Sequence, residues 1–298
     1  MRLHANPNSP PLRLFATVLA LGAFYWGLFR VPVAGSAGGG LEPDKARELQ
    51  EESAVMQRYG NWTKALPLTL KLHEAYPESH IYIGQLADIY DHLGRFREEA
   101  EMWEAFLERA PRPIEGCPQI GQSYEKQGLP KQAMKAFERC LAIEPTDPDQ
   151  VFYLARSVEK DGQIDRAAAL YARGVELSPN YSDLAVGLAR VRMRQGKVEE
   201  ARRLLVHVLE QSPKNPDALL VLGLACERLG QRQEAKNYLE RGVAVAGDYV
   251  DMHLALASLA EQEADLTTAI LHYGKAVELD KSNTDAARRL DMLRKVRQ

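Results

Sequence analysis

The sequence repeats a pattern of side chains every 34 residues, and this recurrence limits the possible folds more than any other feature. The copy at 148–181 shows the pattern clearly. Its positions 4, 7, 8 and 11 are apolar or small, which is the spacing of one helical face: Val151, Leu154, Ala155 and Val158. Gly162 then ends this helix, because glycine enters a left-handed cap without steric cost, and Pro179 ends a second helix. Each copy therefore predicts a hairpin of two helices.

Seven copies keep one register, and their ranges are 46–79, 80–113, 114–147, 148–181, 182–215, 216–249 and 250–283. Position 15 is glycine in the first six copies and Ala264 in the last. Position 8 is always small: Ser53, Ala87, Gly121, Ala155, Ala189, Gly223 and Ala257. Position 20 is alanine in every copy except the second, where Glu99 precedes Ala100. Small residues at positions 8 and 20 let the two helices approach closely.

This pattern resembles the tetratricopeptide repeat family, with its spaced large and small residues, turn glycine, alanine at position 20 and late proline. The resemblance implies an all-α, right-handed superhelical solenoid of seven helical hairpins. It also implies that the first helices line a concave surface on which family members commonly hold peptides. Residues 284–298 have apolar side chains among many charges and predict a C-terminal cap helix.

Several local signals agree with this register. A capping side chain stands directly before the predicted first helix at Ser79, Asp147, Asn215 and Asn283. The first copy departs most from the pattern, since Glu52 replaces the large apolar residue at position 7 and Pro67 falls early in the second helix. Terminal repeats are often atypical because one side faces solvent.

The N-terminal segment differs in composition from the repeats. A basic segment at 1–13 precedes an apolar segment at 14–33, and a glycine-rich stretch at 34–45 predicts a flexible linker. Two interpretations of 14–33 stay open: a transmembrane anchor, or a signal segment that is cleaved to release a soluble exported protein. The positive charges before the segment favour an inside N-terminus, which places the repeats on the outer, periplasmic side in a bacterium.

Composition excludes several classes of function. The net charge of −3 provides no general basic field, so nucleic acid is not an expected partner. Neither catalytic motifs nor paired metal-ligand spacings occur, so we expect no enzyme activity, no cofactor and no metal. Cys117 and Cys140 lie at positions 4 and 27 of one hairpin and both point inward. Whether they form a disulfide or stay buried thiols is left open by the sequence.

The face of the first helix that is opposite to the intra-repeat contacts predicts a peptide-binding groove. Apolar residues recur at position 5, and basic residues lie nearby at positions 9 and 13. The candidate groove residues are Phe152, Arg156, Lys160, Val186, Arg190, Met193, Arg194, Leu220 and Leu224. An acidic and partly apolar segment suits such a surface. Two structural alternatives remain: the apolar residues pack on the next repeat, and the arginines pair with Glu159 or Glu227.

These features together predict a membrane-tethered, non-enzymatic scaffold for protein–protein interaction, acting as an envelope assembly factor or adaptor. An anchored receptor that faces the cytosol and binds targeting peptides is one alternative. A regulatory subunit of an enzyme complex is another.

Overall fold

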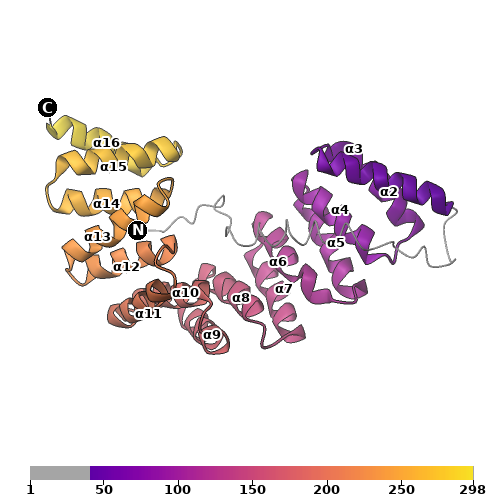
Figure 1. Cartoon of the computed structure of the whole chain (residues 1–298), viewed down its shortest axis with the longest axis horizontal. Helices are drawn as coiled ribbons and strands as arrows, with labels where there is room; N and C mark the ends of the chain where they lie inside the picture. Colours follow the sequence, from indigo (N-terminus) through magenta and orange to yellow (C-terminus); the bar gives the residue numbers. More distant parts are fainter. Residues whose placement is uncertain (1–40, 298) are drawn as a thin grey trace. The chain divides into compact units, whose positions relative to one another are not determined.

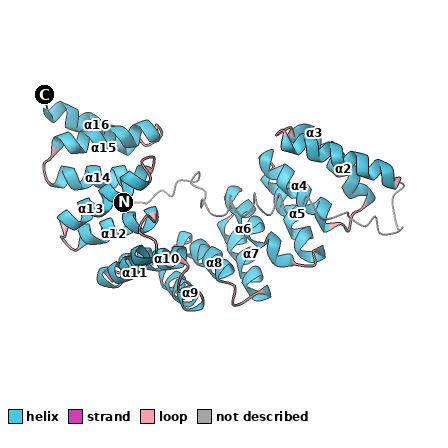
Figure 2. Ribbon diagram, in the orientation of Figure 1, coloured by secondary structure: helices cyan, strands magenta, loops and turns pink. Residues whose placement is uncertain are grey.

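A computed structural model of the chain describes residues 41–297, which form helices and connecting turns without any strand in that range (Figure 2). The expected all-α fold of stacked helical hairpins is confirmed. The chain divides into two compact units, Met1–Arg109 and Ala110–Gln298. The predicted segments at 1–13 and 14–33, and most of the linker at 34–45, lie outside the described residues. No helix within the described residues is long and apolar enough to cross a membrane.

The first unit contains two hairpins in its described part (Figure 1). Their helices are α2 (Pro43–Arg58), α3 (Trp62–Ala75), α4 (His80–His92) and α5 (Phe96–Arg109). The second unit continues with five hairpins and a final helix. Its elements are η1 (Pro113–Gly116), α6 (Cys117–Lys126), α7 (Pro130–Ile143), α8 (Pro148–Lys160), α9 (Ile164–Leu177), α10 (Ser182–Arg194), α11 (Val198–Gln211), α12 (Pro216–Arg228), α13 (Arg232–Val245), α14 (Val250–Gln262), α15 (Leu266–Leu279) and α16 (Thr284–Arg297).

The turn between the two helices of each hairpin has the left-handed backbone that the glycine column predicts. All six glycines at position 15 have a positive φ, between 69° and 86°. Ala264 adopts the same conformation with φ 58° and is the one such non-glycine residue in the described range. A left-handed alanine costs about 1 kcal/mol or more relative to the ordinary helical region. The last hairpin therefore keeps the turn geometry at a local cost.

Side-chain caps occur at three of the four expected positions. Asp147 accepts a bond from the backbone N–H of Asp149, Asn215 from Ala218, and Asn283 from Ala286. Ser79 stands at the start of α4 without a side-chain cap bond.

The third copy begins differently from the expectation. A 3-10 turn, η1, occupies the predicted start of its first helix, and α6 begins at Cys117. Pro118 provides the physical reason, because a helix that began at Ile114 would place this proline in its interior, where its missing N–H loses a bond. Starting at Cys117 keeps Pro118 in the first turn, where no N–H is needed.

The core of each hairpin depends on close approach between positions 8 and 24. A Cβ atom added to Gly121 would lie 2.1 Å from Cζ of the fully buried Phe137, and one added to Gly223 would lie 2.7 Å from Cγ of Leu239. In the first hairpin the hydroxyls of Ser53 and Thr69 take the same two positions and are 2.7 Å apart. The side chain at position 24 of the second helix thus packs directly against the small residue at position 8 of the first helix.

This contact yields a prediction with opposite signs at two glycines. Gly121→Ala should lower the free energy of unfolding by about 1–3 kcal/mol, because the Phe137 ring must shift in a filled core. Gly274→Ala in α15 should raise it by about 0.5–1 kcal/mol, since nothing lies within 4 Å of the added Cβ and alanine favours the helix. Urea unfolding followed by circular dichroism measures both. Equal stability of the two variants would contradict the proposed role of Gly121.

Candidate functional site: the first-helix surface

The first helices of consecutive hairpins in the second unit pack on one another, in the order α6, α8, α10, α12 and α14. They form one continuous surface, which we call the first-helix surface (Figure 1). All nine candidate groove residues belong to α8, α10 and α12. Their repeat positions are therefore brought side by side, and their exposure decides which of them a ligand can reach.

The apolar candidates are mostly used for packing. Val186, Met193 and Leu220 are buried within one hydrophobic cluster, so they offer little surface to a partner. Phe152 and Leu224 are half-buried. The Phe152 ring stacks on Tyr181 with 6.0 Å between ring centroids. Burial at position 5 thus follows the packing alternative in α10 and α12, and a partly accessible ring remains in α8.

A buried carboxylate organises the basic candidates. The guanidinium of Arg190 donates two bonds to Glu159, with Nε–Oε1 at 2.8 Å and Nη2–Oε2 at 2.7 Å. The Tyr171 hydroxyl donates to the same carboxylate at 3.0 Å. The side chain of Glu159 is only 10% exposed, whereas Arg190 is 33% exposed. Burial alone would lower the pKa of Arg190, but the hydrogen bonds and negative charge of Glu159 outweigh it and raise that pKa.

The same arrangement recurs one repeat earlier. Glu125 lies 2.9 Å from Nζ of Lys160 and 3.7 Å from Nη2 of Arg156. The Arg156 guanidinium also lies 5.6 Å from the ring centroid of Phe152, within the range of a cation–π interaction. Arg156 therefore covers the aromatic side chain that sequence reasoning assigned to a ligand.

The glutamates at position 12 form a ladder that joins consecutive repeats. The alternative that an arginine pairs with Glu159 is confirmed for Arg190, but the sequence analysis missed the recurrence of such pairs. The members of the ladder are Glu125, Glu159, Glu227 and Glu261. Glu227 accepts a bond of 2.6 Å from Gln262 of the next repeat, and Glu261 lies 3.2 Å from Arg289 of α16. The recurrence of glutamate at one repeat position was visible in the sequence and is the signal that would have revealed the ladder.

The ladder is interrupted between the fifth and sixth repeats. Position 12 of the fifth repeat is Met193, and Arg228 donates instead to the Met193 carbonyl at 2.9 Å. Position 9 of the next repeat is Leu224, where the two preceding repeats have arginine. The surface is therefore more apolar at this joint than at the joints on either side.

The opposite edge of this surface carries carboxylates at the start of the first helices. Tyr181 donates to Asp149 at 2.6 Å, and Tyr249 donates to Asp217 at 2.5 Å. Burial, together with these aspartates, raises the pKa of both phenols. Acidic groups thus occupy one edge of the surface and basic groups the other, because all the first helices run in the same direction.

Glu159 yields a prediction that separates its two arginines. Arg190→Ala should lower the free energy of unfolding by about 1–3 kcal/mol, because a buried carboxylate loses two charge-assisted bonds. Arg194→Ala should change it by less than about 0.5 kcal/mol, since its 45% exposed side chain lies 3.9 Å from Glu159 and surface pairs contribute little. Thermal and urea unfolding measure the difference. Equal losses would contradict the central role of Arg190.

The two cysteines of the third hairpin form a disulfide. Cys117 of α6 and Cys140 of α7 are bonded, and both are fully buried. Positions 4 and 27 lie close in other hairpins too: a Cβ added to Gly174 would be 3.1 Å from Cγ1 of Val151, and one added to Gly242 would be 3.6 Å from Cβ of Leu219. Cys226 is a buried free thiol. The structure thus favours the disulfide among the two possibilities that the sequence left open.

A pair of histidines in the last hairpin is explained by its own bonds. Nε2 of His253 is 3.0 Å from the Gly247 carbonyl, and since a carbonyl only accepts, this nitrogen carries the hydrogen. Nδ1 of His253 then accepts from Nδ1 of His272 at 2.9 Å. No group of three or more metal-ligating side chains occurs within residues 41–297. We therefore interpret the pair as structural.

Comparison with known proteins agrees with this geometry. Two family profiles, both described as tetratricopeptide repeat, match the chain. One matches residues 115–147, and the other matches 158–210 and 195–259. Residues 115–147 and 158–259 thus contain tetratricopeptide repeats. Proteins with these repeats generally act as scaffolds for protein interaction. The first two hairpins and most of the last lie outside the matched residues. They keep the same spacing, with a turn glycine in the first two and Ala264 in the last. A comparison with curated protein sequences gave no match.

Solved structures share the fold. A tetratricopeptide repeat protein from Parabacteroides merdae superimposes with a TM-score of 0.70 and 14% identity, over 83% of this chain and 98% of that one. A thermophilic repeat protein of Thermus thermophilus gives 0.54 and 26%, over 60% and 98%. A chain from the APC/C hetero-tetramer Cut9–Hcn1 gives 0.64 and 16%, over 81% of this chain and 48% of that one.

Proposed function

We propose that this protein is a non-enzymatic scaffold that holds a segment of a partner protein on the first-helix surface of its second unit. One observation carries the proposal. Two glutamates, Glu125 and Glu159, serve four cations on this surface: Arg156, Lys160, Arg190 and Arg194. Two carboxylates do not neutralise four cations, so an excess of positive charge remains. The most exposed of the four are Lys160 at 50%, which also pairs with Glu125 at 2.9 Å, and Arg194 at 45%.

The proposed ligand is an acidic segment with apolar residues. Carboxylates pair with the two exposed cations, and an apolar side chain reaches Phe152 or Leu224, both of which are half-buried. Val186, Met193 and Leu220 act from beneath the surface by holding its shape. Arg156 and Arg190 contribute in part through the ladder, since each is already bound to a glutamate.

We further propose that segment 14–33 tethers or exports the protein so that the repeats act on the outer side of the membrane. The disulfide between Cys117 and Cys140 supports this location, because such bonds persist in oxidising compartments and are rare in the cytosol. An envelope assembly factor or adaptor has these properties. The alternative receptor that faces the cytosol is disfavoured by the same bond.

Affinity capture tests the binding surface. Full-length protein in detergent is used as bait against solubilised membranes of its own host, beside the variant Lys160→Gln/Arg194→Gln. This variant removes the two most exposed charges and the bond of Lys160 to Glu125, while Arg156 stays near Glu125 and Arg190 keeps its bonds to Glu159. Because Lys160 and Arg194 are about half exposed, stability should stay within about 0.5 kcal/mol. We expect a directly bound partner to be recovered at least tenfold less.

The matched control is Lys131→Gln/Lys135→Gln, which removes two exposed charges from the second helix of the third hairpin. We expect it to recover the partner as the unmodified protein does. Equal recovery by all three baits would place binding elsewhere on the chain. Recovery by none of them would overturn the proposal that this surface holds a membrane-associated partner.

A thiol count tests the location. Cells are treated with an alkylating reagent in denaturant before lysis, so that the native redox state is preserved. We expect only Cys226 to be labelled without reductant, and all three cysteines after reduction. Removing the bond in Cys117→Ser/Cys140→Ser should lower the free energy of unfolding by about 3 kcal/mol, given the 23-residue separation. Three labelled thiols without reductant would contradict the outer location.

A further inference from the structure

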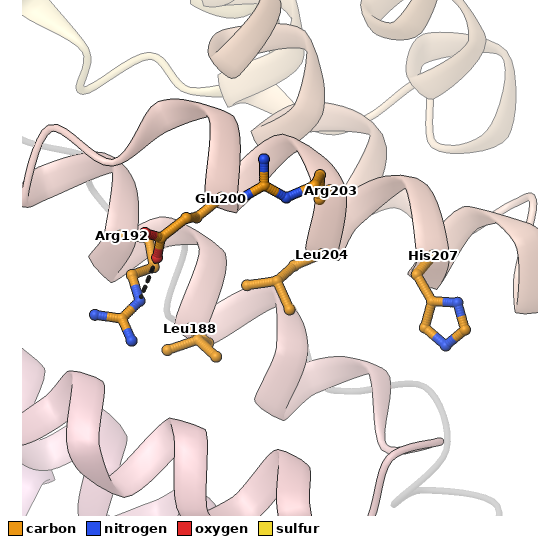
Figure 3. A pocket seen from close by; sticks show the side chains of 6 residues that line it. All are labelled: Leu188, Arg192, Glu200, Arg203, Leu204 and His207. Atoms are coloured by element: carbon orange, nitrogen blue, oxygen red, sulfur yellow. Dashed lines mark ion pairs between the residues drawn. The ribbon is translucent and has the colours of Figure 1, made fainter.

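A shallow, solvent-open cavity of about 410 Å³ lies on the surface between the two helices of the fifth hairpin, α10 and α11 (Figure 3). It is lined by Leu188, Arg192, Glu200, Arg203, Leu204 and His207. Figure 3 shows Leu188 and Leu204 facing each other, with the Arg192–Glu200 ion pair toward one end and His207 toward the other. Four of the six residues come from the second helix, α11, so this site is separate from the first-helix surface.

An arginine lines this cavity at a position where the other copies have uncharged side chains. Arg192 is at position 11, where the other six copies have uncharged side chains: Met56, Tyr90, Tyr124, Val158, Cys226 and Ala260. Its guanidinium lies 3.3 Å from Glu200 and 2.8 Å from the side-chain oxygen of Gln195. These two partners hold the Arg192 side chain at one end of the cavity.

A second departure uncovers the far end of the cavity. In the fourth and sixth repeats, the arginine at position 26 donates to a carbonyl of the preceding turn: Arg173 to Pro145 and Arg241 to Pro213. The fifth repeat has His207 at this position, and its ring is paired with Glu210 at 3.4 Å. Of the fourth, fifth and sixth repeats, the fifth is thus the one in which position 26 makes no hydrogen bond to a carbonyl of the preceding turn.

The lining has the chemistry of a site for an anion attached to an apolar group. Glu200 is already bound to Arg192, whereas Arg203 has no hydrogen bond or ion pair with any residue in the described range. The N–H groups of its guanidinium are therefore available to pair with a carboxylate, close to Leu188 and Leu204.

We propose that this cavity binds a short acidic segment of a partner protein. An aliphatic side chain packs against the half-buried Leu204, with the buried Leu188 beneath it, and a neighbouring carboxylate pairs with Arg203. From Glu200 to His207 the lining follows two turns of α11, about 10 Å at 1.5 Å per residue. An extended peptide covers that length with about three residues. The protein therefore has two separate surfaces for acidic segments, one on each side of the repeat stack.

A peptide titration observed at His207 tests this site. The probe is acetyl-Glu-Leu-Glu-amide, with acetyl-Gln-Leu-Gln-amide as its uncharged counterpart, added to the full chain carrying 15N-labelled histidine. His207→Gln assigns the ring signal. We expect a saturable shift of the His207 ring with the glutamate peptide, and at least tenfold weaker binding of the glutamine peptide.

Matched variants decide whether the cavity is responsible. Arg203→Glu should weaken binding at least tenfold, and Lys135→Glu, the same change of charge at the same position of the third repeat, should leave it unchanged. Arg192→Met restores the kind of side chain found at this position in the first repeat, so it should fill the cavity, keep or raise the melting temperature and abolish binding. Lys160→Gln/Arg194→Gln should not alter the affinity, which separates this site from the first-helix surface.

Three outcomes would overturn the proposal. The first is no saturable shift at His207. The second is an equal loss of affinity in Arg203→Glu and Lys135→Glu, which would indicate a general charge effect. The third is full affinity in Arg192→Met with an unchanged fold, which would mean that the peptide does not enter the cavity.

Discussion

The fit of a small residue on the first helix against a large residue on the second sets the distance between the helices of a hairpin. Gly121 with Phe137, and Gly223 with Leu239, leave no room for even one added carbon atom. The same approach brings positions 4 and 27 together, which is why Cys117 can bond to Cys140. Since each hairpin packs mainly on its neighbours, this one local distance is repeated throughout each unit and governs its stacking.

The ladder of glutamates depends on that stacking. A carboxylate with 10% exposure is costly unless it is paired, and Glu159 is satisfied by Tyr171 of its own repeat and Arg190 of the next. The ladder thus makes the contact between repeats specific as well as apolar. It lies on the same surface where we place the partner segment, so the residues that hold the repeats together also set the charge that a ligand meets.

The fifth repeat departs from the others on both of its faces. Met193 interrupts the ladder on the first-helix surface, and its neighbour Arg192 lines the cavity beside α11. These two residues are adjacent in sequence but point to different surroundings, because successive residues of a helix are about 100° apart. A scaffold built of similar units gains its distinct binding sites at such departures, where packing no longer requires the usual side chain.

The sequence by itself determined the hairpins, their register and the left-handed turns, because helical periodicity and the glycine requirement of a positive φ are local properties. It also placed all nine candidate groove residues on the first helices. It did not distinguish Val186, which is buried, from Lys160, which is half-exposed, nor did it identify Glu159 as the partner of Arg190 in preference to solvent. Arg190 lies 31 residues from Glu159, so their contact depends on how one hairpin is rotated onto the next. That rotation comes from the packing of whole helices, and only the tertiary structure decided it.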